Sequence, residues 1–205
     1  MTRSLTIPGP AGDLQASFTD PGSSTDTTAI AVLCHPHPLY GGNMDDAVLD
    51  CLAAILFEQG VASLRFNFRG VGTSGGKYSG TGGEVNDLLE VIDWVRSEYQ
   101  PDRLILGGYS FGASIVCEAE VETVARIVLI APPVLIAPPV GRLAVKEPEA
   151  SVPVDIIVGD QDEFIDLSQL RSWSGANVHV ISDADHFFSD RWTELESALR
   201  DTLRC

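Results

Sequence analysis

Strand-like and helix-like patterns alternate along most of the chain. Short runs that are apolar at every position or at alternate positions, as buried strands are, lie at 29–34, 61–66, 103–106, 127–130, 154–158 and 178–181. Longer segments repeat their apolar residues at helical spacing, at 47–59, 85–99, 113–121, 165–173 and 192–203. This alternation predicts an α/β fold with a mostly parallel sheet and helices on both of its faces.

Two further segments complete the predicted architecture. Segments 4–7 and 14–18 alternate apolar and polar residues around a turn rich in Pro and Gly, which predicts an antiparallel hairpin at the N-terminal edge of an eight-stranded sheet. The proline-rich stretch between Ile130 and Val154 predicts an extended loop and is too short for a folded cap domain. With 205 residues, we expect a single domain over residues 1–205.

The pentapeptide Gly108-Tyr109-Ser110-Phe111-Gly112 stands between a predicted strand and a predicted helix. Glycines on both sides of the serine allow a sharp turn that presents the hydroxyl in the open, so we predict that Ser110 is a nucleophile. The alternative is an ordinary Gly-Ser turn. If sites lie at the carboxyl ends of the parallel strands, this turn marks the functional edge of the sheet.

A serine nucleophile needs a histidine base, and the base needs a carboxylate that orients it. His186 follows the last predicted strand at the same sheet edge, whereas His179 lies within that strand and is expected to be structural. Asp162 follows the strand 154–158 and is the predicted carboxylate, with Asp160 and then Glu163 as rivals. The chain order Ser, Asp, His is the order found in α/β-hydrolases.

Acyl transfer also needs backbone amides that bind the developing oxyanion. We expect one from Phe111 and the second from His37, because Pro36 and Pro38 lack an N–H; Leu39 and Tyr40 are the next candidates. A metal pair of His35 and His37 is disfavoured because no thiolate or carboxylate lies nearby at ligand spacing, and no metal is predicted. Leu39, Tyr40 and Tyr109 are candidate substrate contacts.

The glycine-rich loop after residue 66 does not predict a cofactor. Gly70-x-Gly72 is not followed by a helix at dinucleotide-binding spacing, and Gly76-Lys77 lacks the pattern of a phosphate-binding loop, so no cofactor is expected. Arg69 could contact substrate, but we favour a structural role in which it bonds to loop carbonyls.

Charge and composition limit the kinds of partner that this protein is expected to bind. A net charge of −16 disfavours binding to nucleic acid or to an anionic membrane. The N-terminus does not resemble a secretory signal and no apolar run is long enough to span a membrane, so a cytoplasmic location is expected. The cysteines, Cys34, Cys51, Cys117 and Cys205, have no metal-like spacing and are expected to be reduced thiols.

Taken together, these motifs resemble the small, capless prokaryotic α/β-hydrolases related to dienelactone hydrolase. The similarity rests on the blocks H-P-H-P-L-Y-G-G (35–42), R-F-N-F-R-G-V-G-T-S (65–74), G-Y-S-F-G (108–112), I-A-P-P-V (130–134), G-D-Q-D (159–162) and A-D-H-F-F (184–188). The resemblance implies a serine hydrolase with the triad Ser110, Asp162 and His186 and an oxyanion hole formed by Phe111 and the His37 region. Dienelactone hydrolase itself has cysteine as its nucleophile, so the serine here departs from that activity.

The expected reaction is cleavage of a small-molecule carboxylic ester or thioester through an acyl-enzyme. Without a cap, the site should be open and suit small or exposed acyl groups. A thioesterase or acyltransferase in a biosynthetic pathway would use the same triad and is the alternative. A non-catalytic binding protein on the same fold is the third possibility, because a fold alone does not establish activity.

Overall fold

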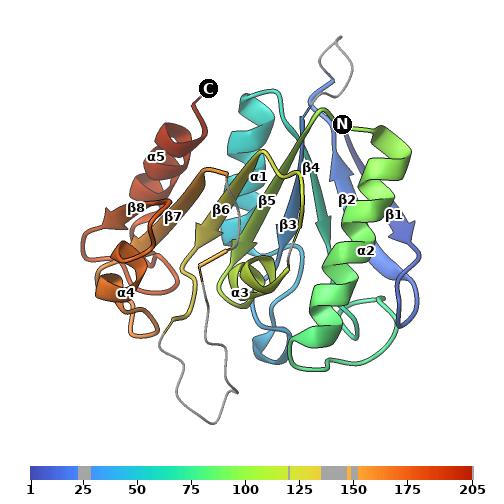
Figure 1. Ribbon diagram of the computed structural model, residues 1–205, viewed down its shortest axis with the longest axis horizontal. Coiled ribbons are helices and arrows are strands. Elements are labelled where there is room, and N and C mark those ends of the chain that lie inside the picture. The colour runs from blue at the N-terminus through green and yellow to red at the C-terminus, as the bar shows by residue number, and fades with distance from the viewer. Residues whose placement is uncertain (23–28, 120, 135–146, 149–151, 205) are drawn as a thin grey trace.

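An eight-stranded sheet forms the centre of the computed structural model, which describes residues 1–22, 29–119, 121–134, 147–148 and 152–204 (Figure 1). In sheet order the strands are β1 (Thr2–Ile7), β2 (Leu14–Thr19), β4 (Ala62–Phe66), β3 (Ala29–Cys34), β5 (Arg103–Tyr109), β6 (Arg126–Ile130), β7 (Val154–Gly159) and β8 (Ala176–Ile181). β2 is antiparallel to both of its neighbours, and all strands from β4 to β8 pair in parallel. The predicted α/β fold with an N-terminal hairpin is confirmed.

Helices cover both faces of this sheet. Their bounds are α1 (Ala47–Glu58), α2 (Gly82–Tyr99), α3 (Phe111–Glu118), α4 (Leu167–Arg171) and α5 (Trp192–Leu203), with a short 3-10 turn, η1 (Pro38–Tyr40). α2 and α3 pack against each other in front of the sheet, and α1 lies behind it (Figure 1). α5 contacts α1, β7 and β8, and α4 packs against β8. No cap domain is present in the part of the chain that the structure describes.

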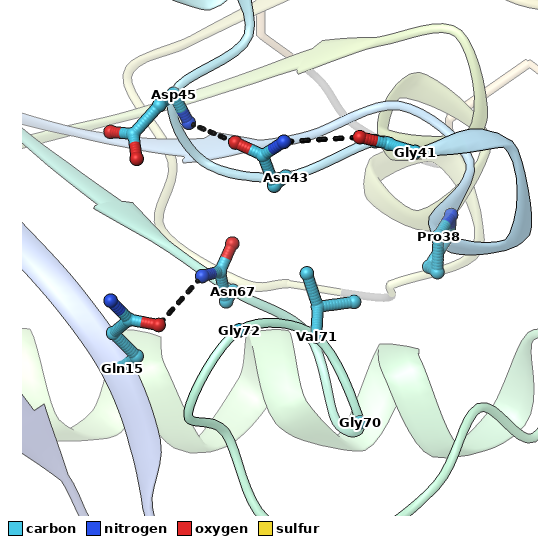
Figure 2. A pocket seen from close by; sticks show the side chains of 10 residues that line it. Gln15, Pro38, Gly41, Asn43, Asp45, Asn67, Gly70, Val71 and Gly72 are labelled. Atoms are coloured by element: carbon cyan, nitrogen blue, oxygen red, sulfur yellow. Dashed lines mark hydrogen bonds between the residues drawn. The ribbon is translucent and has the colours of Figure 1, made fainter.

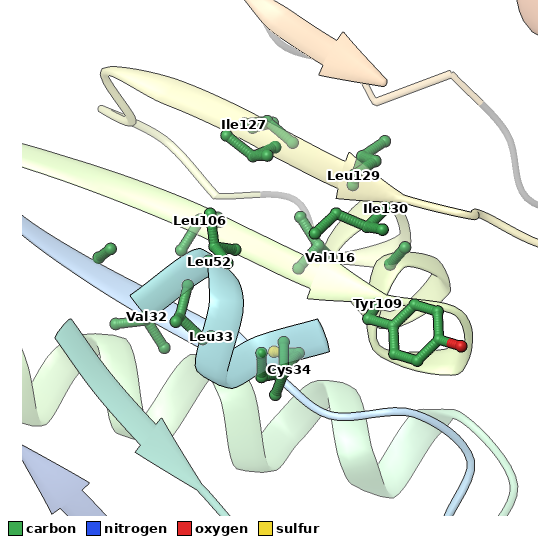
Figure 3. Close-up of a cluster of buried hydrophobic side chains, with 14 of the residues drawn as sticks. Val32, Leu33, Cys34, Leu52, Leu106, Tyr109, Val116, Ile127, Leu129 and Ile130 are labelled. Carbon is green, nitrogen blue, oxygen red and sulfur yellow. The ribbon is translucent and has the colours of Figure 1, made fainter. Parts of the chain in front are cut away.

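The core is continuous through the middle of the sheet. β3, β5, β6 and β7 are buried almost along their whole length, as expected for parallel strands that are covered on both faces. Figure 3 shows how Leu52 of α1 and Val116 of α3 join side chains of these strands. Gly107 of β5 lies under α1, where an added Cβ would come within 2.7 Å of the Leu33 side chain. The site at the end of β5 is therefore built on strands that are buried almost along their whole length.

Several helix ends differ from the sequence prediction; α1 ends at Glu58 and not at 59, and α2 begins at Gly82 and not at 85. α3 begins at Phe111 and not at 113, because the chain turns directly into a helix after Ser110 despite the low helix propensity of Gly112. α4 is shorter than the predicted 165–173, because the Asp166 side chain accepts hydrogen bonds from the Ser168 and Gln169 amides and so fixes the start of the helix at Leu167.

The strand order changes direction at β3. The chain passes from β3 to β4 on one side of β3 and then returns to β5 on its other side. The loops that follow β3 and β5 therefore diverge at this point, which is where open α/β sheets bind their ligands. The loop with His37 and the turn with Ser110 flank this switch point.

Two further expectations concern membranes and thiols. Among the described helices, none combines the length and the hydropathy needed to cross a membrane. Cys34, Cys51 and Cys117 are free, and burial raises the pKa of the Cys51 thiol to about 11. Cys205 lies outside the described residues.

Candidate active site

Ser110 occupies a strained turn between β5 and α3. Its backbone has φ 53° and ψ −117°, a conformation that side-chain-bearing residues rarely adopt and that costs about 1–3 kcal/mol. The flanking glycines are required by contacts. A Cβ on Gly108 would lie 2.5 Å from the Gly112 backbone, and one on Gly112 would lie 2.1 Å from the Cys34 oxygen. The turn therefore depends on backbone packing at both glycines.

His186 and Asp162 reach Ser110 from the loops that follow β8 and β7. His186 Nδ1 lies 2.7 Å from Asp162 Oδ2, and His186 Nε2 lies 2.9 Å from Ser110 Oγ. Because a carboxylate only accepts hydrogen bonds, Nδ1 carries the proton, and the neutral ring accepts the serine hydroxyl at Nε2. The Asp162 side chain is fully buried, and its other oxygen accepts the Phe164 amide at 2.9 Å.

The rival carboxylates lie elsewhere. Asp160 is exposed and accepts the Asp183 amide at 2.8 Å, so it ties the two loops together and has no bond to His186. Glu163 is exposed, and the structure gives it no bond to the histidine. His179 lies within β8 beside Asp155, at 3.7 Å, and not at the carboxyl ends of the strands. Of the predicted histidines and carboxylates, the structure brings only His186 and Asp162 to Ser110.

Tyr109 requires a correction. We predicted a substrate contact, but this side chain is only 3 % exposed, and its hydroxyl donates a hydrogen bond to the His186 carbonyl at 3.0 Å. Its ring stacks on the imidazole with centroids 5.6 Å apart. Tyr109 is the last residue of β5, next to the nucleophile, and its side chain lies beneath the site. It therefore positions the histidine loop and does not face substrate.

Exposed apolar side chains lie in the loop after β3 and beside His186. Leu39 and Tyr40 are 68 % and 73 % exposed, as a substrate contact requires. Phe164 and Phe187 are 41 % and 63 % exposed, and their rings lie 4.8 and 5.3 Å from the imidazole. We call these four residues the apolar rim. The sequence prediction did not include Phe164; its position two residues after the candidate carboxylate, in a loop, was the available signal.

The two predicted oxyanion donors belong to residues whose side chains pack against each other, with the His37 and Phe111 ring centroids 4.9 Å apart. Phe111 is the first residue of α3, so its amide has no partner inside the helix, and among the described residues no other group accepts it. The His37 amide is likewise without an acceptor in the described part of the chain. The amides of Leu39 and Tyr40 donate to His37 Nδ1 and to the His37 carbonyl, so they are already in use.

The His37 side chain fixes this loop. Its Nδ1 accepts the Leu39 amide at 3.2 Å, so the neutral ring carries its proton on Nε2, which lies 3.1 Å from the Tyr78 hydroxyl. The ring also packs against Phe111 with centroids 4.9 Å apart, and burial lowers the pKa of His37. Tyr78 was not predicted, because no pattern in the glycine-rich loop links it to residue 37.

His35 joins two loops and is not available to a metal. Its Nε2 accepts the Phe68 amide at 3.1 Å, and its Nδ1–H donates to the Pro36 carbonyl at 2.6 Å. Burial lowers the pKa of His35 to about 4. Since both ring nitrogens of His35 and of His37 have protein partners, the pair cannot bind a metal in this arrangement. The described residues contain no group of His, Cys, Asp or Glu side chains that could hold one.

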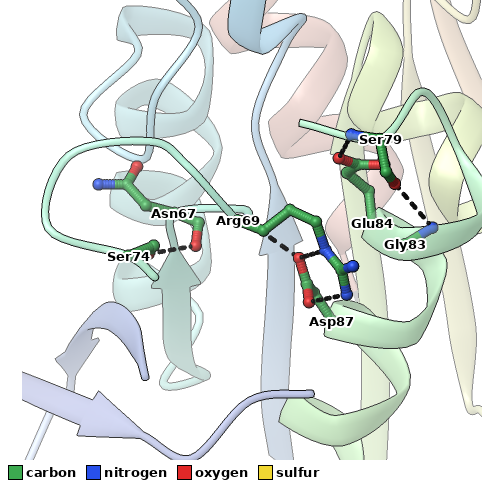
Figure 4. A network of polar contacts seen from close by, with 7 residues as sticks. All are labelled: Asn67, Arg69, Ser74, Ser79, Gly83, Glu84 and Asp87. Carbon is green, nitrogen blue, oxygen red and sulfur yellow. Dashed lines mark hydrogen bonds and ion pairs between the residues drawn. The ribbon is translucent and has the colours of Figure 1, made fainter. Parts of the chain in front are cut away.

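Arg69 has the structural role that we favoured, with a different partner. Its guanidinium makes two bonds to the buried Asp87 carboxylate, at 3.0 and 2.6 Å, and its amide donates to the same group (Figure 4). The nearby Glu84, also buried, accepts the Ser79 amide and hydroxyl. These bonds attach the glycine-rich loop to α2. We expected loop carbonyls as the partners of Arg69, and the structure provides a carboxylate from α2.

The fold and the strand-turn-helix position of Ser110 are those of an α/β-hydrolase. Residues 29–201 match the model of the alpha/beta hydrolase domain family, and the chain belongs to that family. The structure is similar to an alpha-beta serine hydrolase homologue from Coxiella burnetii, with a TM-score of 0.88 and 36 % identity over 98 % of this chain and 97 % of the other.

Two further relatives match nearly the whole chain. XC6422 from Xanthomonas campestris, described as an α/β serine hydrolase without lid, has a TM-score of 0.85 and 32 % identity over 99 % of this chain and 94 % of its own. The uncharacterized protein RP471 of Rickettsia prowazekii is 33 % identical over 95 % of this chain and 86 % of its own. These similarities support the small capless hydrolase class; the closer relation to dienelactone hydrolase stays a prediction.

Proposed function

We propose that this hydrolase cleaves small-molecule carboxylic esters or thioesters through an acyl-enzyme on Ser110. The observation that carries the proposal is the continuous chain of contacts from Ser110 Oγ to His186 Nε2, at 2.9 Å, and from His186 Nδ1 to Asp162, at 2.7 Å. A serine hydroxyl is a weak nucleophile at neutral pH, and a histidine within hydrogen-bond distance can remove its proton during attack.

In the proposed first step, Ser110 Oγ attacks the ester carbonyl while His186 Nε2 takes the hydroxyl proton. The buried Asp162 carboxylate stabilises the imidazolium that forms. The negative charge on the carbonyl oxygen is accepted by the amides of Phe111 and His37, which have no other acceptor among the described residues. The imidazolium then protonates the departing alcohol or thiol, and the acyl group remains on Ser110.

In the second step, water enters next to His186 and loses a proton to Nε2 as it attacks the acyl-enzyme. Collapse of this intermediate releases the acid and returns the proton to Ser110. Esters and thioesters suit this site better than amides, because their leaving groups need less protonation. We include in the proposal a carboxylesterase-like reaction, a small-molecule substrate instead of nucleic acid or membrane, and a cytoplasmic location.

Covalent labelling tests the nucleophile. We expect one fluorophosphonate adduct by intact-mass spectrometry in the wild type and none in Ser110→Ala, with turnover of p-nitrophenyl acetate lost in the same variant. Ser114→Ala is the matched control, since Ser114 lies one helical turn further on, is buried, and its hydroxyl has no partner among the described residues. An adduct that persists in Ser110→Ala contradicts the proposal. Comparing oxygen esters with thioesters of one acid then separates an esterase from a thioesterase.

A further inference from the structure

A polar cleft lies beside the proposed oxyanion loop. It has a volume of about 440 Å³ and lies between the loop after β3 and the loop after β4, with Gln15 of β2 at its side (Figure 2). Pro38 and Val71 give it apolar walls, and glycines supply much of the remaining lining. Ser110 and His186 do not line it. The mechanism above therefore gives this cleft no role.

The cleft offers a free donor and a free acceptor. Gln15 Oε1 already accepts from Asn67 and Thr73, but its Nε2 donates to nothing in the described part of the chain. The Asp45 carboxylate is exposed and likewise has no bond to a described group. The polar atoms of Asn43 and Asn67 are used within the protein: Asn43 bonds Gly41 and Asp45, and Asn67 bonds Met44 and Gln15.

A free donor beside a free acceptor suits an uncharged ligand that carries hydroxyls. A hydroxyl both donates and accepts, so neighbouring hydroxyls can satisfy the Asp45 carboxylate and the Gln15 amide at the same time. An anion is disfavoured, because no Lys, Arg or His lines the cleft and the chain carries a net charge of −16. The apolar walls at Pro38 and Val71 would contact the C–H faces of such a ligand.

The position of the cleft indicates which portion of an ester substrate, the alcohol or the acyl portion, it would bind. His186 must protonate the leaving group, so the alcohol portion lies next to the imidazole, beside Phe164 and Phe187 of the apolar rim. The cleft lies in the β2–β4–β3 half of the sheet edge, and residues of the loop that begins at His37 line it. Pro38, in its wall, is adjacent in sequence to the proposed oxyanion donor.

We propose that the preferred substrate is an ester with an apolar alcohol portion and a hydroxyl-bearing, uncharged acyl portion that binds in the cleft at Gln15 and Asp45. This inference rests on the proposed function, since it uses Ser110, His186 and the oxyanion amides to set the direction of the substrate. It adds a substrate class to a site whose chemistry alone would accept many esters.

Matched esters test the inference. The probes are the benzyl esters of cyclohexanecarboxylic acid and of a tetrahydroxycyclohexanecarboxylic acid, which share the leaving group and the ring. We expect the wild type to favour the hydroxylated ester in kcat/KM by about tenfold, the effect of one or two hydrogen bonds formed at a solvent-exposed site. Asp45→Ala and Gln15→Met should each reduce this preference several-fold, through a higher KM for the hydroxylated ester.

Controls separate this inference from the proposed function. Asp93→Ala removes an exposed carboxylate on α2 and should leave the preference unchanged. Asp45→Ala removes no internal bond, so it keeps the test valid if Gln15→Met fails to fold. A wild type without preference, or a preference that both cleft variants retain, overturns the inference while esterase activity stands.

Calorimetry measures how tightly the two esters bind to the inactive Ser110→Ala variant, and so tests the inference without turnover. The hydroxylated ester should bind more tightly than its partner, and Asp45→Ala should reduce the difference several-fold. If no ester is hydrolysed and no fluorophosphonate adduct forms, the proposed function fails, and this binding difference alone decides whether the cleft binds hydroxyl groups. Equal binding of the two esters overturns the inference.

Discussion

The turn that carries Ser110 and the loops that carry His186 and Asp162 meet at one site but are held by different interactions. The turn is fixed by backbone contacts at Gly108 and Gly112, where no side chain fits. The two loops are fixed to each other both by backbone bonds, such as that of the Gln161 amide to the Ala184 carbonyl, and by side-chain bonds, such as that of Asp160 to the Asp183 amide. The Tyr109 hydroxyl adds a bond to the His186 carbonyl. Adding a side chain at Gly112 should therefore disrupt the whole turn, whereas removing one side-chain bond should affect the loops only in part.

The largest effect is expected at Asp162. Asp162→Asn removes the acceptor that holds the proton on His186 Nδ1, so kcat/KM for an ester should fall by about 10²–10⁴-fold. Asp160→Asn is the matched control and should keep activity within about threefold, with a small loss of stability, because it only bonds the loops. Equal losses in the two variants would contradict the assignment. Steady-state kinetics decide between them.

Gly112→Ala tests the backbone-fixed turn. A Cβ at this position would lie 2.1 Å from the Cys34 oxygen, so the free energy of unfolding should fall by at least about 3 kcal/mol. Gly82→Ala, at the start of α2, meets nothing within 4 Å and should change it by less than about 1 kcal/mol. Denaturant unfolding measures both. A Gly112→Ala variant as stable as Gly82→Ala would show that the turn can relax.

His35 tests a side-chain tie between the loops after β3 and β4. Its pKa is lowered to about 4 from 6.5, so the unfolded chain binds the proton first as the pH falls. The free energy of unfolding should therefore decrease as the pH falls from about 6.5 to about 4, by up to about 3 kcal/mol from this residue. His35→Gln should flatten that part of the profile. A variant profile parallel to the wild type would contradict the buried neutral state.

Strain at Ser110 should be measurable in the inactive enzyme. Glycine adopts φ 53° without cost, whereas alanine keeps the strain, so Ser110→Gly should be more stable than Ser110→Ala by about 1 kcal/mol after the greater chain entropy of glycine is subtracted. Both variants lack the nucleophile, which makes them a matched pair. Thermal and denaturant unfolding compare them, and equal stability would place the strain elsewhere.

The smallest effect is expected at Tyr109. Tyr109→Phe leaves the His186 carbonyl without its hydroxyl donor and should cost about 1 kcal/mol of stability, with a few-fold loss in kcat as the histidine loop loosens. Tyr40→Phe changes an exposed hydroxyl and should shift stability by less than about 0.5 kcal/mol. The comparison fails if both variants behave alike in unfolding and in kinetics.

The sequence by itself determined the alternating α/β pattern, the N-terminal hairpin and the strand-turn-helix at Ser110, because each depends on local periodicity or on glycine at fixed offsets. It also indicated which loops carry the candidate histidine and carboxylate, since parallel strands bring their carboxyl ends to one edge.

Tertiary structure alone decided which side chains face the site. Tyr109 lies beneath the imidazole, Phe164 lies beside it, and Arg69 binds Asp87 of α2. The polar cleft at Gln15 and Asp45 joins β2 to loops far along the chain. These contacts could not be predicted, because they depend on how segments distant in sequence pack against one another, and no local pattern records that packing.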